Sequence, residues 1–304
     1  MRVNLKLFIM KTKILLFASL LSIAFFMSCD NETTNTAVDP KTITVDDAVV
    51  NSEIDASVDD VTIIVEDQFD VQKSLISKTS ANERTSSGGM KSMLPVCATI
   101  TFALTNDTWT RTIDFGTQGC ILPNGNVVKG KIIISFSKNF TTTSKTILYK
   151  LDGFYHNGNK IEGSSTIIHE LKDSVLLPNI IHPVTTHRIE IKITSPEGKV
   201  FTSVGTRVRE MVEGFLTISN WEDNVFKVWG YKTTTFPNGS KYNCIIKESP
   251  LVIKMSCKLP FPVSGVVNIE KNDVKATLDY GKGECDKLAT ITINGVSKEI
   301  ELKK

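Results

Sequence analysis

The sequence predicts a mainly β protein: a large antiparallel meander, formed as a curled sheet, half-barrel or sandwich, with one or two N-terminal helices packed on it. Residues 187–194 alternate in character from one position to the next, which is typical of a half-buried strand. Asn-Gly pairs recur between β-branched or aromatic runs, and both residues tolerate the positive φ angles of tight hairpin turns. No helical periodicity of useful length follows residue 95.

An export signal is the first predicted element. Four basic residues precede or flank the start of an apolar run from Ile14 to Met27. The run is shorter than the roughly 20 apolar residues that span a bilayer, and this pattern is typical of a secretory signal peptide. We therefore expect residues 1–28 to be a signal peptide, with Met10 as the natural start of the chain.

Cys29 follows Ser28 directly after this apolar run. The arrangement resembles a bacterial lipoprotein signal, in which the thiol of Cys29 would carry lipid and become the mature N-terminus. Several acyl chains, palmitate among them, hold a protein on a membrane more firmly than one chain does. The resemblance implies an exported protein anchored to the outer membrane, at its periplasmic or its cell-surface face. The alternative is an ordinary signal peptide with an incidental cysteine.

A tether and a helical segment come next. Residues 29–43 are polar and predict a flexible tether. Residues 44–77 predict helix, because Thr44 and Asp47 have the spacing of a helix start and the apolar residues recur at helical intervals. These apolar residues are Ile54, Val58, Val61, Val65 and Phe69.

The charges of the chain are unevenly distributed. Residues 30–71 contain twelve carboxylates and one lysine, so the rest of the chain carries an excess of positive charge. Contact between this acidic segment and a basic body is one alternative, and separately solvated charges are the other. Residues 78–94, rich in Ser, Thr and Gly, predict a linker to a β body at residues 95–304. The net charge of the whole chain is only +2, which argues against nucleic-acid binding.

Five cysteines follow Cys29, an odd number for an exported protein. An aliphatic-Asp-aromatic-Gly-x-x-x-Cys pattern occurs twice, ending at Cys120 and at Cys285, and each copy has one cysteine upstream. The repeated context favours Cys97–Cys120 and Cys257–Cys285 disulfides, which export would permit. The alternative joins Cys244 to Cys257 and leaves Cys285 unpaired.

Each copy of this pattern also contains an aspartate, Asp114 in the first and Asp279 in the second. They are candidates for a catalytic or calcium-binding role. The alternative is that each carboxylate accepts backbone hydrogen bonds in the turn that the following glycine allows.

The segment from residue 257 to 295 resembles the closing segment of a family of exported lipoproteins from Bacteroidota. The positions that match are Cys257, Ser264, Gly265, Asp279, Gly281, Gly283, Cys285 and Asp286. Residues 112–136 are similar to the central strand-turn-strand of that family, so the resemblance covers about residues 95–304. Two prolines after Cys257 and the extra Cys244 depart from the family pattern. No activity is assigned to the family, so the resemblance implies localisation and fold alone.

No common catalytic or metal-binding pattern is present. His169-Glu170 lacks the second histidine of a zinc protease, and His182 and His187 are spaced so that they face opposite sides of a strand. His156 is the fourth histidine. We therefore predict no catalytic residues, no metal and no cofactor.

Aromatic residues are the better candidates for ligand contact. Trp221, Trp229 and Tyr231 are candidates for stacking on a glycan, with Trp229 and Tyr231 on one strand face and Phe226 on the other. The alternative for this stretch is a buried core strand.

Two polar features have less specific interpretations. Arg207, Arg209 and Lys192 form basic stripes, which we interpret as a solvated face rather than an anion site. Asp173-Ser174-Val175 resembles the sequon that Bacteroidota use for O-glycosylation, which would make Ser174 the acceptor, although three residues also match by chance.

The first functional hypothesis is a membrane-anchored binding or adhesion module of the envelope or surface, without catalysis. Its partners would be the membrane, through lipid on Cys29, and a glycan or another envelope protein. The alternatives are a carrier or assembly factor, in which a curled sheet shelters an apolar ligand and the acidic helices act as a plug, and an enzyme acting on polysaccharide. An apolar concavity would favour the carrier, and a cleft of convergent carboxylates the enzyme.

Overall fold

The computed structural model describes residues 42–80, 92–217 and 220–302. Contacts divide the chain into two units, Met1–Pro40 and Lys41–Lys304, and all the described residues belong to the second. The predicted signal peptide, Cys29 and most of the predicted tether lie outside the described residues. In the described ranges, no helix has both the length and the apolar composition that crossing a membrane requires.

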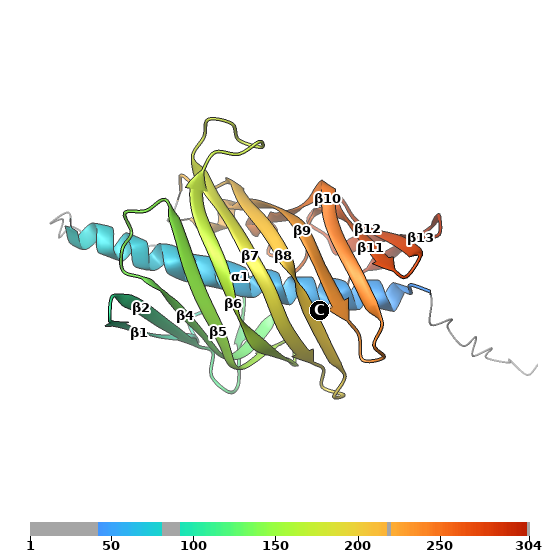
Figure 1. The fold of residues 1–304 in the computed structure, drawn as a ribbon, viewed down its shortest axis with the longest axis horizontal. Helices are drawn as coiled ribbons and strands as arrows, with labels where there is room; N and C mark the ends of the chain where they lie inside the picture. The colour runs from blue at the N-terminus through green and yellow to red at the C-terminus, as the bar shows by residue number, and fades with distance from the viewer. Residues whose placement is uncertain (1–41, 81–91, 218–219, 303–304) are drawn as a thin grey trace, which may run out of the picture. The chain divides into compact units, whose positions relative to one another are not determined.

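The second unit consists of one curled antiparallel sheet and one long helix, α1 (Val45–Ser80), which confirms the predicted fold class (Figure 1). Each strand pairs with its neighbours in chain order, except that the short β3 pairs only with β4. The strands are β1 (Thr99–Thr105), β2 (Thr108–Asp114), β3 (Cys120–Ile121), β4 (Val127–Ser137), β5 (Ser144–His156), β6 (Asn159–Lys172), β7 (His182–Thr194), β8 (Val200–Glu213), β9 (Val225–Thr235), β10 (Lys241–Lys254), β11 (Ser264–Lys271), β12 (Val274–Lys282), β13 (Leu288–Ile293) and β14 (Val296–Glu301). Two short 3-10 helices, η1 (Trp221–Asp223) and η2 (Met255–Cys257), follow β8 and β10.

The helix begins at a reciprocal cap. The Asp47 backbone N–H donates to Thr44 Oγ1 at 3.1 Å, and the Thr44 N–H donates to Asp47 Oδ2 at 2.9 Å. These two bonds satisfy backbone donors that a helix start leaves without partners. From there one continuous helix extends to Ser80, a few residues into the predicted linker.

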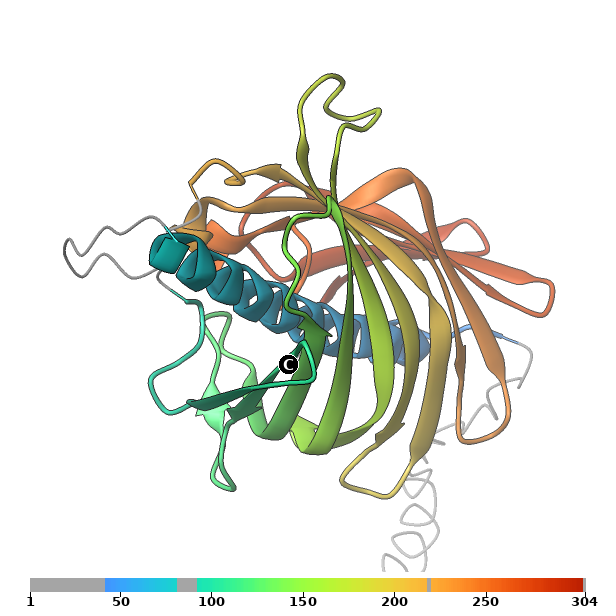
Figure 2. The ribbon, with the colours of Figure 1, turned by 60° about the vertical axis from the view of Figure 1, so that its left-hand side comes forward.

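The helix runs through the hollow of the curled sheet (Figure 2). The predicted apolar positions of α1 are buried, and Phe69 is only 1% exposed. Its ring centroid lies 5.2 Å from that of Phe136 and 5.6 Å from that of Phe140. The apolar residues that the helical spacing identified therefore form part of the contact between α1 and the concave face of the sheet.

Glycine at a strand irregularity helps the sheet to curl. The register of β4 against β5 shifts between Lys129 and Lys131. Gly130 between them has a φ of +85°, and a Cβ at this position would overlap the backbone of Gly153. Such irregularities bend and twist a strand, so a glycine here lets two strands approach closely while the sheet turns around α1.

Buried ionic contacts join α1 to the concave face. Asp55 Oδ1 accepts a hydrogen bond from Arg207 Nη2 at 2.9 Å and lies 3.0 Å from Lys232 Nζ. Glu66 pairs in the same way with Arg209. The acidic segment and the basic body are thus in contact, which was one of the two alternatives open from the sequence.

The interpretation of Arg207 and Arg209 as a solvated stripe is therefore wrong. Their side chains are 6% and 4% exposed because they point toward the helix. Lys192 differs, since its side chain is 52% exposed and pairs with Glu162 at 3.3 Å.

The cysteines are paired as the repeated pattern predicts. Cys97–Cys120 and Cys257–Cys285 have Cα–Cα distances of 5.9 and 5.3 Å, within the limit of about 7 Å for a disulfide. Cys244 is a free and buried thiol. Burial raises the pKa of this thiol to about 11, so it stays protonated at neutral pH.

The two predicted turns also share their geometry. Asp114 Oδ1 accepts from the Gly116 N–H at 2.8 Å, and Asp279 Oδ1 accepts from the Gly281 N–H at 2.9 Å. Both aspartates therefore have the turn-stabilising hydrogen bond that was the alternative to a catalytic role.

A carboxyl on α1 should make stability depend on pH. Burial, followed by the charge of Asp55, raises the pKa of Asp59 to about 7 from its ordinary value of 3.8. The folded state therefore keeps a proton that the unfolded state releases, so this contribution is complete below about pH 4 and is lost as pH rises toward 7. Asp59→Asn should raise the free energy of unfolding relative to wild type more at about pH 8 than at about pH 5.

Urea denaturation at the two pH values measures this difference, and Asp46→Asn at an exposed position of the same helix is the control. Equal effects of Asp59→Asn at both pH values would show that Asp59 ionises at a similar pH in the folded and unfolded chains.

Candidate functional site

Two sizeable cavities lie between α1 and other described parts of the chain, one along each half of the helix. The larger has a volume of about 420 Å³ and lies beside the second half of α1, at the ends of β6 to β9. We call it the apolar pocket. Its apolar lining includes Met211, Phe215, Leu216, Trp221, Phe226 and Met255.

The mouth of the apolar pocket carries exposed apolar side chains. Leu216, after β8, is 86% exposed, and Ile181, before β7, is 62% exposed. Exposed apolar side chains that also line a cavity are expected at a ligand-binding site.

One wall of the apolar pocket is polar and comes mainly from α1. Burial, and then the charge of Glu66, raises the pKa of Asp70 to about 7. Burial also raises the pKa of Asp67, although hydrogen bonds from Ser92 and other donors oppose this shift. The pKa of His169 on β6 is lowered by burial, so its imidazole is neutral at neutral pH. The pocket thus combines a large apolar surface with a few titratable groups.

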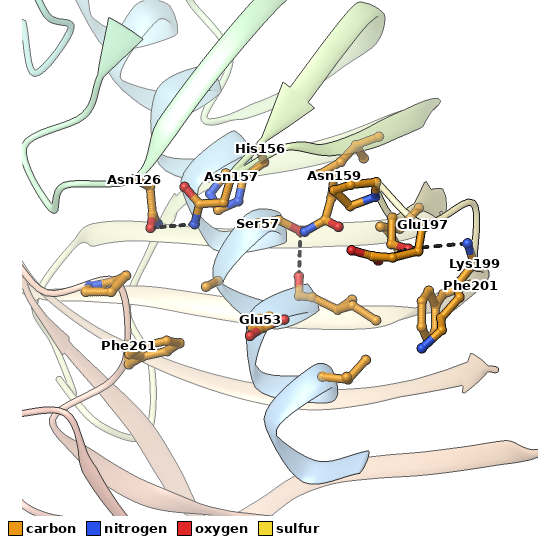
Figure 3. A pocket seen from close by; sticks show the side chains of 18 residues that line it. Glu53, Ser57, Asn126, His156, Asn157, Asn159, Glu197, Lys199, Phe201 and Phe261 are labelled. Atoms are coloured by element: carbon orange, nitrogen blue, oxygen red, sulfur yellow. Dashed lines mark hydrogen bonds between the residues drawn. The ribbon is translucent and has the colours of Figure 1, made fainter. Parts of the chain in front are cut away.

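The smaller cavity, of about 280 Å³, lies beside the first half of α1 and is more polar (Figure 3). Glu53 and Ser57 of the helix face His156 and Asn159 of the β5–β6 hairpin across it. Burial raises the pKa of Glu53, and the nearby charge of His156 opposes that shift. We call this cavity the polar pocket.

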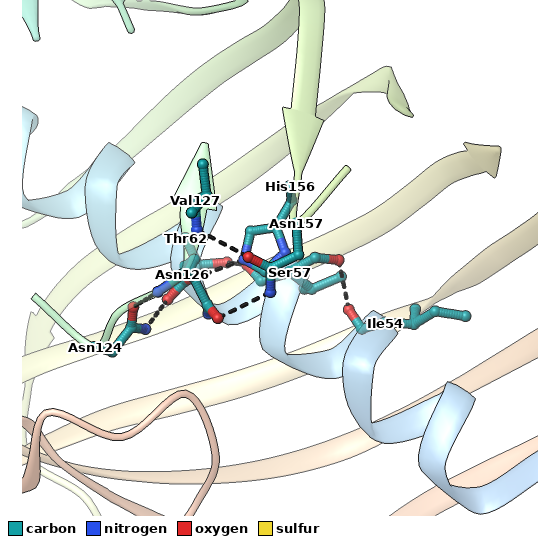
Figure 4. A network of polar contacts seen from close by, with 10 residues as sticks. Ile54, Ser57, Thr62, Asn124, Asn126, Val127, His156 and Asn157 are labelled. Carbon is teal, nitrogen blue, oxygen red and sulfur yellow. Dashed lines mark hydrogen bonds and ion pairs between the residues drawn. The ribbon is translucent and has the colours of Figure 1, made fainter. Parts of the chain in front are cut away.

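A hydrogen-bond network forms one end of the polar pocket (Figure 4). The buried carboxylate of Asp60 accepts from Asn124 and Asn126 at 2.7 Å each, and lies 2.8 Å from His156 Nε2. Asn157 in turn donates to Asn126 Oδ1 at 2.9 Å. The network ties α1 to two hairpins, and its geometry is that of a structural clamp.

The polar pocket shows no nucleophile paired with a base among the described residues. Ser57 Oγ donates to the Ile54 carbonyl at 2.8 Å, while His156 Nε2 is engaged with Asp60. Covalent catalysis would need a hydroxyl or thiol within hydrogen-bond reach of its base. Within the described ranges, no three His, Cys, Asp or Glu side chains are grouped so that they could hold a metal ion.

Another histidine does contact hydroxyl groups, but deep in the core. His187 Nδ1 lies 2.9 Å from Thr62 Oγ1, and its Nε2 lies 2.8 Å from Tyr149 OH. Burial and the charges of nearby arginines lower the pKa of His187 to about 3. Because all three side chains are buried, these contacts hold α1 against the sheet.

The predicted aromatic residues are not brought together. Trp221 lines the apolar pocket with Phe226, whereas Tyr231, on the other face of β9, is 58% exposed. Trp229 shares that other face and is half-buried. Of the three stacking candidates, Trp221 alone therefore lines a cavity in the described part of the chain.

Ser174 lies in the loop before β7 and is half-buried. Its hydroxyl donates to Glu210 Oε2 at 2.7 Å and accepts from the Leu176 and Leu177 N–H groups. Glu210 Oε2 also lies 3.2 Å from Nε2 of the buried His182. The hydroxyl thus organises this loop, and glycosylation of Ser174 stays a prediction.

No protein-family model, curated protein or solved structure matches this chain. The resemblance to exported lipoproteins of Bacteroidota therefore stays a prediction, and so does the lipid on Cys29, which lies outside the described residues.

Proposed function

We propose that this chain is a ligand-binding protein of the cell envelope that shelters an apolar small molecule in the apolar pocket. In this proposal lipid on Cys29 anchors it to the outer membrane, and no catalytic step takes place. The carrier alternative is thereby preferred to the adhesion module, because the sheet is concave and holds a cavity.

The observation that carries the proposal is the cavity of about 420 Å³ with its apolar lining. Pockets that hold small molecules have volumes of about 300 to 1,000 Å³, an apolar lining and a few placed polar groups. The polar pocket, at about 280 Å³, has fewer apolar walls and shares its polar groups with the Asp60 clamp.

Dye binding tests the proposal directly. The purified chain is titrated with phenylnaphthylamine, whose emission rises in an apolar site. Met211→Trp should fill the pocket from β8 and lower the affinity at least about tenfold, a change of roughly 1.4 kcal/mol.

The matched control, Val204→Trp, places the same side chain on the exposed face of the same strand and should leave affinity unchanged. Dye binding that is absent in wild type, or equal in wild type and Met211→Trp, would contradict the proposal.

The anchor is tested separately. Cys29→Ser removes the thiol that lipidation requires, so we expect the chain to leave the membrane fraction or to accumulate as an unprocessed precursor. Fractionation and intact mass measure both outcomes. Normal processing and membrane retention of Cys29→Ser would contradict the lipoprotein prediction.

A further inference from the structure

A small extension of about 10 Å³ lies beside the inner end of the apolar pocket. It shares Glu66, Asp70, His169 and Phe226 with the lining of that pocket, and it is also lined by Arg209 of β8. The volume is about that of one water molecule. A ligand in the apolar pocket could therefore place one small polar group here.

The guanidinium of Arg209 lines this extension and has N–H donors without a partner among the described residues. One amino group of its guanidinium, Nη2, donates to Glu66, and the guanidinium lies 4.2 Å from the centroid of the Phe226 ring. Its Nε and Nη1 groups have no acceptor among the described residues, although the residue is only 4% exposed. His169 Nδ1 is also buried without a partner there.

Unpaired buried donors are costly. A buried polar group that lacks a hydrogen-bond partner has lost its bonds to water without replacement. Because an arginine guanidinium carries N–H donors and no acceptor, only a hydrogen-bond acceptor can satisfy Arg209. The inner end of the pocket is therefore suited to a ligand oxygen.

We propose that the ligand of the apolar pocket is a carboxylic acid with an apolar tail, whose carboxylate accepts a hydrogen bond from a free N–H group of Arg209 beside Asp70. This inference rests on the proposed function and specifies its ligand. One oxygen of the carboxylate fits the water-sized extension and can accept from a free N–H of the guanidinium, and such charge-assisted hydrogen bonds are stronger than neutral ones.

Protonation of Asp70 would remove the repulsion between its side chain and the negative charge of the ligand. The pKa of Asp70 is raised to about 7 by burial and by Glu66, so a bound carboxylate would favour its protonated form, which can donate a hydrogen bond. The other charged or titratable groups around it are Glu66, Asp67, Lys73, His169 and Arg209. Acid binding should therefore take up a proton and weaken as pH rises above 7.

The test compares laurate with dodecanol and dodecylamine, which have the same tail and differ in the polar group. Each displaces phenylnaphthylamine from the purified chain at about pH 6 and about pH 8. We expect laurate to bind at least about tenfold more tightly than either analogue at the lower pH, because only its carboxylate can form a charge-assisted hydrogen bond with Arg209. Its advantage should shrink at the higher pH.

Arg209→Gln should remove the preference for laurate and leave dodecanol affinity unchanged. Arg207→Gln is the matched control, because Arg207 lies on the same face of β8 and pairs with a helix carboxylate but lines neither the pocket nor its extension. It should keep the preference. If Arg209→Gln does not fold, the comparison of the three probes in wild type tests the carboxylate inference by itself.

The outcomes separate the two proposals. Dodecanol binding as tightly as laurate, or dodecylamine binding best, would overturn the carboxylate inference and leave an apolar site. Absence of dye binding and of displacement by all three probes would overturn the proposed function itself.

Discussion

Asp55→Ala should lower the free energy of unfolding by about 3–5 kcal/mol, the usual cost of leaving a buried charge without its partner. The carboxylate of Asp55 contacts two cations, Arg207 and Lys232, whose side chains are 6% and 0% exposed. The variant would leave both cations inside the hollow of the sheet, where water cannot compensate them. Urea denaturation measures the effect.

Two comparisons separate charge from packing. Asp55→Asn keeps the shape of the side chain but removes its charge and one acceptor oxygen, so it should still lose most of the stability that Asp55→Ala loses. Asp46→Ala, at an exposed position of the same helix, should change stability by about 0.5 kcal/mol or less. A loss below about 1 kcal/mol for Asp55→Ala would indicate that water reaches the ion pair in the folded chain.

Removal of the Cys257–Cys285 disulfide, by replacing both residues with Ser, should cost about 2–5 kcal/mol. The bond closes a sequence separation of 28 residues, and its loss increases the conformational freedom of the unfolded chain. Urea denaturation without reductant measures the cost, and Cys244→Ala, which removes a free thiol, should cost only about 1 kcal/mol.

Peptide mapping without reduction is the direct test of connectivity. A peptide that links Cys244 to Cys257 would contradict the pairing in the structure. It would also remove the argument from the repeated Asp-aromatic-Gly pattern.

Local patterns predicted the elements well because each depends on neighbouring residues. The alternation at residues 187–194 lies within β7, and Thr44 with Asp47 does start the helix. The Asn-Gly pair at residue 157 forms a hairpin turn, where Asn157 and Gly158 have φ angles of +48° and +85°. Such signals need no knowledge of the rest of the chain.

Local patterns could not predict which face of β8 points toward the helix. Val204 of β8 is 55% exposed, while Arg207 and Arg209 point inward. A strand that alternates polar and apolar residues is expected to bury its apolar side, but here the partner of the inner side is an acidic helix. The relevant signal was the charge imbalance between residues 30–71 and the rest of the chain.

The apolar pocket was also beyond sequence reasoning, except for Trp221. Its lining comes from α1, from the ends of β6 to β9 and from segments beside β1 and β10, and its apolar residues are common core types. Met211 and Phe226, for example, carry no pattern that distinguishes a pocket from a core. Only the curvature of the sheet, which glycines such as Gly130 permit, brings them to one cavity.

The central position of α1 has a consequence for the order in which the chain can fold. The helix is synthesised before any strand, yet Asp55 is 152 residues from Arg207, its partner on β8. The sheet can grow hairpin by hairpin from local contacts, whereas the helix must close a long loop, which is the slower process. Until its partners exist, mutual repulsion among its carboxylates keeps this segment extended and hydrated. The same charges that hold the finished core together therefore keep its first segment from collapsing too early.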